Sequence, residues 1–204
     1  FMKKMIVMAL GLLLSASLHA QQETGTLTIQ PKVGLNMASV TKSDGSDPRF
    51  GLAAGAELEY QLSDMISLSG GALYSMQGVK GEDSGINGTI KFDYINIPLL
   101  VNIYATKGLA VKFGLQPGFM INDKVKVSTG GVSAEVGVEE ALHNAGINAK
   151  LNKFDLSIPV GLSYQFSNNL VLDARWIVGL TKIIKDQDGS NSVLQLTVGY
   201  KFAL

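Results

Sequence analysis

Residues 154–166 read FDLSIPVGLSYQF, and the alternation within them points to the fold. Every second residue from Phe154 to Phe166 is apolar, and most of the residues between them are small or polar. Successive side chains of a β-strand point to opposite faces of the sheet, so this period of two predicts a strand with one apolar face. The stretch is also long enough to cross a membrane when tilted, which takes about 9–11 residues.

The same alternation recurs along the whole chain. Seven further segments show it, at residues 27–37, 52–61, 66–77, 94–104, 109–122, 170–181 and 194–202. None of the apolar faces carries a charged residue. A sheet in lipid must close on itself, because an open edge would leave backbone groups unpaired with no water to satisfy them. The sequence therefore predicts an all-β fold, an eight-stranded antiparallel up-and-down transmembrane β-barrel.

The connections between these segments alternate in length. Three are tight, at residues 63–65, 105–107 and 167–169, and four are longer and polar, at residues 39–49, 78–91, 123–153 and 182–192. Short periplasmic turns and long outer loops are typical of bacterial outer-membrane barrels. Within the longest connection, residues 124–136 are predicted to form a hairpin and the segment from Glu139 a short helix. Pro98, Pro117 and Pro159 lie inside predicted strands, where we expect local bulges.

A soluble lipocalin-like barrel would alternate in the same way, so the composition of the two faces decides between the alternatives. The polar face is crowded with glycine and serine, for example Gly114, Gly118 and Gly161, which suits a narrow lumen better than a solvated surface. Aromatic residues recur near the strand ends of the apolar face, where membrane-interface girdles lie, at Tyr60, Phe154, Phe166, Tyr200 and Phe202. Both observations favour the membrane.

Composition agrees with this interpretation. Apolar residues make up 46% of the chain and charged residues 17%, below the roughly 25% of soluble domains. There is no cysteine, which excludes a disulfide framework and thiolate metal sites. Residues 1–20 are predicted to be a signal peptide for Sec-type export, with Lys3 and Lys4 before a short apolar run and cleavage before Gln21. Residues 21–204 then form the outer-membrane barrel domain of a Gram-negative bacterium.

The mature chain resembles the small outer-membrane β-barrel family known as porin-family or PorT-family proteins, with an architecture similar to the OmpA and OmpX barrels. Four segments carry the resemblance: PKVGLNMAS at 31–39, FDYINIPLLVN at 92–102, LSIPVGLSYQF at 156–166 and LTVGYKF at 196–202. These patterns are specific for the barrel and not for any activity. The resemblance implies a structural or surface-interaction protein, or a narrow channel for small solutes.

Seven charged residues fall on the lumen side of the predicted strands. They are Lys32, Glu57, Glu59, Lys112, Asp173, Arg175 and Lys201. Charges buried in a narrow lumen must be paired, so we favour a structural, salt-bridged plug. The alternative is an ion or proton path, but an eight-stranded barrel leaves little room for water.

Motifs for enzymatic chemistry are missing. Outside the predicted signal peptide the only histidine is His143, in the longest loop and without a serine nearby, so a lipid-modifying enzyme is the least favoured function. No catalytic residue, cofactor site or metal site is predicted. The expected partners are outer-membrane lipid, the barrel-assembly machinery and an extracellular partner bound through the loops. We expect a monomer that does not bind nucleic acid, since the chain has no basic excess.

Overall fold

The structure is a computed structural model of the chain. It describes residues 23–41, 47–83, 86–129, 132–144, 146–147, 150–185 and 188–204. The predicted signal peptide lies outside the described residues. The elements are β1 (Leu27–Val40), β2 (Asp47–Ser63), β3 (Ile66–Asp83), β4 (Ile86–Asn96), β5 (Leu99–Tyr104), β6 (Leu109–Thr129), β7 (Val132–Gly137), α2 (Val138–Asn144), β8 (Phe154–Gln165), β9 (Leu170–Gly179), β10 (Asn191–Tyr200) and β11 (Phe202–Ala203).

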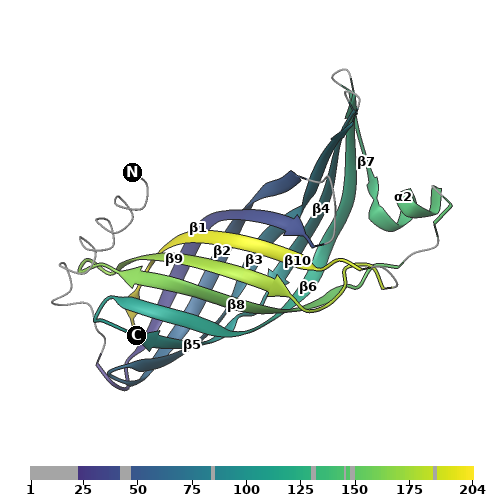
Figure 1. Cartoon of the computed structure of the whole chain (residues 1–204). Helices are drawn as coiled ribbons and strands as arrows, with labels where there is room; N and C mark the ends of the chain where they lie inside the picture. Colours follow the sequence, from purple (N-terminus) through teal and green to yellow (C-terminus); the bar gives the residue numbers. More distant parts are fainter. Residues whose placement is uncertain are drawn as a thin grey trace, which may run out of the picture.

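These strands form a closed antiparallel barrel (Figure 1). Around the ring the order of paired strands is β1, β2, β3, β4 with β5, β6, β8, β9 and β10, and β1 closes the ring by pairing with β10 and β11. Both β4 and β5 lie between β3 and β6, so together they make one interrupted wall strand. The predicted eight-stranded up-and-down barrel is confirmed. No helix in the described residues is long and apolar enough to cross a membrane.

The two faces of the wall divide as the alternation predicts. On β1 the side chains of Gln30, Lys32 and Asn36 are buried, whereas Val33 and Leu35 are more than half exposed. Tyr164 departs from the expected pattern, because it is only 8% exposed although it was assigned to the outer face. Its ring packs edge-on against Phe166, with 4.9 Å between the ring centroids.

The expected bulges at the three prolines are wrong. The ladder has gaps beside Pro98 and Pro159, but the register on either side of each gap is unchanged. A proline removes one donor while its carbonyl still accepts, so the wall stays closed. The Ile97 amide donates to the Pro117 carbonyl at 2.7 Å and the Gly71 amide to the Pro98 carbonyl at 3.2 Å. The bulge in the β4–β6 ladder lies instead at Asp93/Tyr94.

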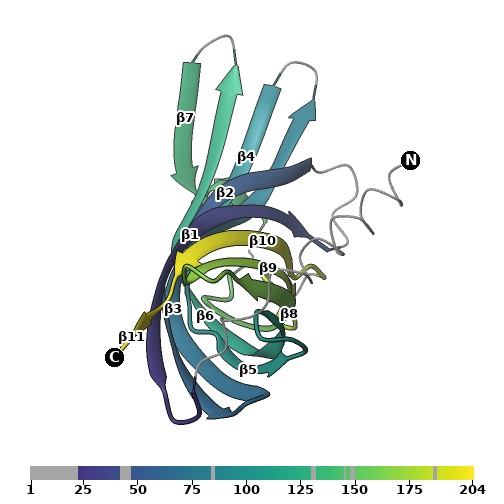
Figure 2. The ribbon, with the colours of Figure 1, turned by 90° about the vertical axis from the view of Figure 1, so that its left-hand side faces the viewer.

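The barrel is much taller at one end than the predicted strands suggested. Residues 78–91 were expected to be a loop, but within this range β3 extends to Asp83, β4 begins at Ile86, and the two strands pair with each other. The predicted hairpin at 124–136 is present as β6 and β7, and α2 follows it at Val138. These two hairpins stand side by side beyond the barrel, opposite the end that carries the short turns (Figures 1 and 2).

Candidate functional site

Five buried charges form an ion-pair network in the lumen, brought together from β1, β2, β6 and β9. Arg175 donates two hydrogen bonds to the carboxylate of Glu57, at 2.6 and 2.8 Å, and a third to Asp173 at 2.7 Å. The Lys32 ammonium lies 2.8 Å from a Glu57 oxygen, and the Lys112 ammonium lies 3.3 Å from Asp173. All five side chains are at most 2% exposed, so each charge depends on its partners rather than on water.

Glycines opposite these charges make the network possible. A Cβ on Gly161 would lie 2.8 Å from Cγ of Arg175, and one on Gly71 would lie 2.8 Å from Cγ of Glu57. Both distances are shorter than real contacts allow. The small residues that the sequence places on the lumen face therefore leave room for long side chains that cross the barrel.

A second cluster lies nearer the short turns, around Glu59. Lys201 lies 2.9 Å from one oxygen of Glu59, and Ser67 donates to the other at 2.7 Å. Tyr104 also donates to Glu59, and it accepts a hydrogen bond from Lys201 at 3.0 Å. The structure thus brings all seven sequence-predicted lumen charges inside the barrel, five in one network and two in this cluster.

Further polar contacts fill the lumen toward the hairpins. Asn36 donates to Ser75 at 2.9 Å and accepts from Gln195 at the same distance. Higher still, Arg49 pairs with Asp93 at 3.3 Å, and Asn122 donates to Asp93 at 2.8 Å. Sequence reasoning missed this last pair, because Arg49 falls in a segment predicted to be a loop and Asp93 beyond the end of a predicted strand.

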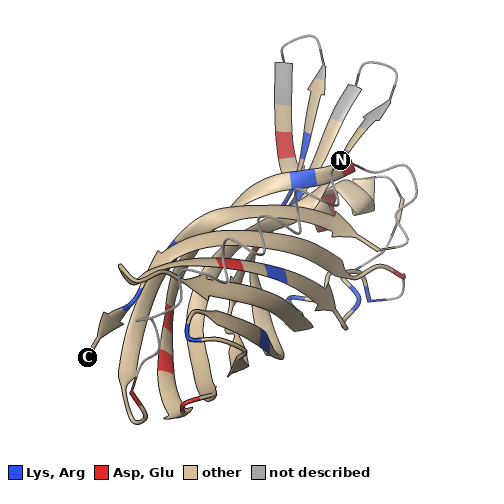
Figure 3. Ribbon diagram, turned by 60° about the vertical axis from the view of Figure 1, so that its left-hand side comes forward, with Lys and Arg blue, Asp and Glu red and all other residues tan. Residues whose placement is uncertain are grey.

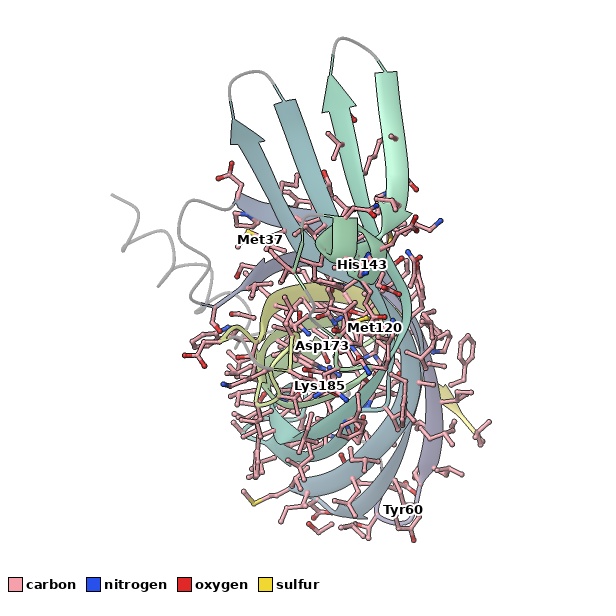
Figure 4. All side chains as sticks on the ribbon, turned by 90° about the vertical axis from the view of Figure 1, so that its right-hand side faces the viewer. Met37, Tyr60, Met120, His143, Asp173 and Lys185 are labelled. Atoms are coloured by element: carbon pink, nitrogen blue, oxygen red, sulfur yellow. The ribbon has the colours of Figure 1, made fainter. Side chains whose placement is uncertain are left out.

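An apolar cluster, the cap, lies at the end of the lumen nearest the hairpins. Its buried residues come from five separate segments: Phe92, Tyr94, Met120, Val138, Leu151 and Ile183. Leu142 of α2 and Ile184 pack against them. In Figure 4 Asp173 lies inside the ring of strands, with Met120 and His143 on the side of the hairpins. The cap could not be predicted from the sequence, since the segments that contribute Val138, Leu151 and Ile183 are polar overall.

Beyond the cap, the hairpins join into one four-stranded sheet in the order β3, β4, β6, β7. One face carries charge: Lys91, Lys124, Lys126 and Glu135 alternate with apolar residues of the other face, and Figure 3 shows acidic and basic residues there. Lys91 and Lys124 both lie within ion-pair distance of Glu135. The hydrogen bond from Lys91 holds the pKa of Glu135 below its usual value. Among the described residues, β7 pairs with β6 alone, so its other edge is open.

A family model described as outer membrane protein beta-barrel domain matches residues 19–185. The chain belongs to this family. A search of curated proteins found no match. Two solved structures are similar to this barrel. Neisserial surface protein A, NspA, has a TM-score of 0.51 at 14% identity and covers 86% of this chain and 97% of its own. OprG of Pseudomonas aeruginosa has a TM-score of 0.50 at 14% identity, over 91% and 100%.

Ail of Yersinia pestis is also similar, with a TM-score of 0.49 at 20% identity, over 88% of this chain and 99% of that one. At these identities the solved structures bear on the fold alone. Membership of the outer membrane beta-barrel family places the chain in the outer membrane of a Gram-negative bacterium. The apolar outer wall of the barrel is therefore its lipid-facing surface, and the hairpin sheet is extracellular, because short turns mark the periplasmic end. The PorT name remains an expectation of the sequence alone.

His143 lies on the exposed part of α2. No group of three or more His, Cys, Asp or Glu side chains within the described residues could hold a metal ion. The chemistry that the buried groups supply is pairing of fixed charges. In this outer-membrane barrel these paired charges lie buried in the lumen.

A filled lumen and an apolar cap predict the electrical behaviour of the barrel. We expect the purified protein in planar bilayers to show no large, steady single-channel conductance, because an ion would have to break the Arg175–Glu57 contacts and cross the cap. Brief, small openings are compatible with this expectation. A stable conductance of the size seen for porins would contradict it and favour the channel alternative.

Proposed function

We propose that this outer-membrane barrel is a non-catalytic surface-interaction protein whose extracellular sheet binds an extended segment of a partner polypeptide. The observation that carries the proposal is the open edge of β7. An unpaired edge presents a row of backbone donors and acceptors, to which another chain can add as a strand. The family model describes a membrane barrel domain and names no catalytic activity, which supports the non-catalytic part.

The sheet supplies both affinity and selectivity for such a strand. Backbone hydrogen bonds along β7 would provide the affinity, while the side chains next to the added strand would select its sequence. Ala134 is exposed on one face and Glu135 on the other, with Val136 partly buried beside them. Below the sheet, the packed lumen and the cap act as a rigid base, which limits the ordering that binding requires.

Shortening one hairpin at a time tests this proposal. Replacing residues 127–134 by Asn-Gly keeps a tight turn but removes Val132–Ala134, which is half of the β7 edge. Replacing residues 81–88 by Asn-Gly shortens the neighbouring hairpin as a matched control. Both variants keep Val138 and Leu142, so the cap stays intact. A random peptide library would be selected against the intact protein in lipid nanodiscs.

We expect the selected peptides to slow amide hydrogen exchange in residues 134–137, to lose binding to the 127–134 variant and to bind the control variant unchanged. Peptides that bind both variants equally, or that protect the cap instead of β7, would overturn the proposal.

Export and assembly follow from the location. We propose that residues 1–20 direct Sec-type export and that the barrel-assembly machinery inserts the chain as a monomer. We also propose that it has no nucleic-acid partner, consistent with the balanced charge of the sequence.

A further inference from the structure

The lipid-facing wall contains an apolar groove of about 640 Å³. It runs across β6, β8, β9, β10 and β1. Its centre is Ala174, whose neighbours in the two adjacent ladders are Leu162 and Leu196. Both leucines are more than half exposed, so they form ridges on either side of the small alanine. A volume in this range is typical of sites that hold a small molecule.

The position of the groove along the strands assigns it to one leaflet. Leu172 and Ala174 lie two and four residues from Leu170, where β9 begins after a periplasmic turn. Four residues of strand rise about 13 Å, and less along the membrane normal when the strand is tilted. Half of the hydrocarbon core is about 15 Å thick. The floor of the groove therefore lies in the periplasmic leaflet, which in an outer membrane consists of phospholipid.

Aromatic rings and an exposed lysine, which suit a lipid headgroup, lie at the periplasmic end of the groove. Two aromatic pairs flank it, Tyr164 with Phe166 and Tyr200 with Phe202, with ring centroids 4.9 and 4.7 Å apart. Such rings mark the headgroup level of outer-membrane barrels. Lys107 is exposed in the turn before Leu109, which itself lines the groove. The Gln165 amide donates to the Gly108 carbonyl at 2.8 Å, which holds this turn beside β8.

We propose that the groove binds an acyl chain of one phospholipid from the periplasmic leaflet, with the lipid phosphate at the Lys107 ammonium. The groove is continuous with the lipid-facing surface, so lipid is the occupant that reaches it directly. An unfilled depression loses dispersion contacts on its lining. A fitted acyl chain restores those contacts, and the preformed ridges lower the cost of ordering it. This lipid is therefore held longer than the lipids around the rest of the wall.

Binding of a phospholipid in the groove can be measured by the lipid that stays on the purified barrel. The barrel would be reconstituted in vesicles of phosphatidylethanolamine and phosphatidylglycerol, transferred to a mild detergent and examined by native mass spectrometry. Ala174→Phe fills the groove, and Lys107→Gln removes the phosphate contact. Ala54→Phe is the matched control, because Ala54 is exposed on the lipid-facing side of β2 and outside the groove. Heat-dependent gel mobility verifies that each variant is folded.

We expect one phospholipid retained on the wild type and on Ala54→Phe, less on Lys107→Gln and none on Ala174→Phe. The only tryptophan, Trp176, offers a second readout, since it is exposed two residues from Ala174 on the same face. Phospholipid with brominated acyl chains, added to the protein in detergent, should quench Trp176 at about one lipid per barrel in the wild type, and Lys107→Gln should need more lipid for the same quenching. Equal retention by wild type and Ala174→Phe, or a dimer seated on this face, would overturn the proposal.

Discussion

Replacing Glu57 by glutamine is expected to destabilise the barrel by about 3–5 kcal/mol, the range for breaking a buried ion pair by removing one partner. Glu57 is the hub of the lumen network. It accepts two hydrogen bonds from Arg175 and one from Lys32. Glutamine has nearly the same shape, so the loss is of charge and not of packing. Unfolding by urea in phospholipid vesicles, followed by gel mobility, measures the change.

The charges left behind explain the size of this effect. With Glu57 neutral, Lys32, Lys112 and Arg175 share the single carboxylate of Asp173 in this network. Removing Arg175 leaves a smaller charge imbalance than removing Glu57, because Lys32 still faces Glu57 and Lys112 still faces Asp173. We therefore expect loss of the acid to be the more costly change.

Two further variants sharpen the test. Glu135→Gln is the same chemical change on the exposed hairpin and should alter stability by no more than about 0.5 kcal/mol. Adding Lys32→Met to Glu57→Gln removes one excess cation and should recover part of the loss. If Glu57→Gln proves as mild as Glu135→Gln, water hydrates the lumen charges and the lumen is not the packed plug described above.

The lumen charges could be predicted from sequence because successive side chains of a strand alternate between the two faces, so every second residue points inward. Lys32, Glu57 and Arg175 all occupy polar positions in clear alternation. Their pairing could not be predicted, since it depends on the register of each ladder. Lys32 lies opposite Gly55 and Gly199, and Arg175 lies opposite Gly161, so the long side chains reach across to one another over glycines.

The extracellular half was predicted less well, for a different physical reason. Outside the membrane the lipid no longer requires one face to be apolar, so the period-two signal weakens although pairing continues. Residues 78–83 and 86–91 carry glycines and charges, yet they pair with each other, and the second of these segments also pairs with β6. The cap is assembled from single residues such as Val138, Leu151 and Ile183 in polar segments, which no local pattern marks.

Replacing Val160 by arginine is expected to cost about 2–4 kcal/mol, the range for a cation on the lipid face of a barrel at the bilayer midplane. Val160 is half exposed at the middle of β8, between Phe113 and Trp176 of the neighbouring strands. Leu99→Arg on β5, which is similarly exposed, should behave alike. The measurement is again urea unfolding in vesicles.

The membrane barrel and the soluble alternative differ in how the cost of an added arginine depends on its depth in the bilayer. Leu180→Arg places the same charge at an equally exposed position just beyond the end of β9, where the cost should fall to about 0–1 kcal/mol near the interface. Ala134→Arg, on the extracellular hairpin, should be neutral because water solvates the new charge. A soluble barrel with a solvated outer wall would show no such gradient, since arginine would meet water at every exposed position. Equal costs at Val160, Leu180 and Ala134 would therefore contradict the placement of this wall in lipid, whereas a cost that peaks at Val160 follows directly from it.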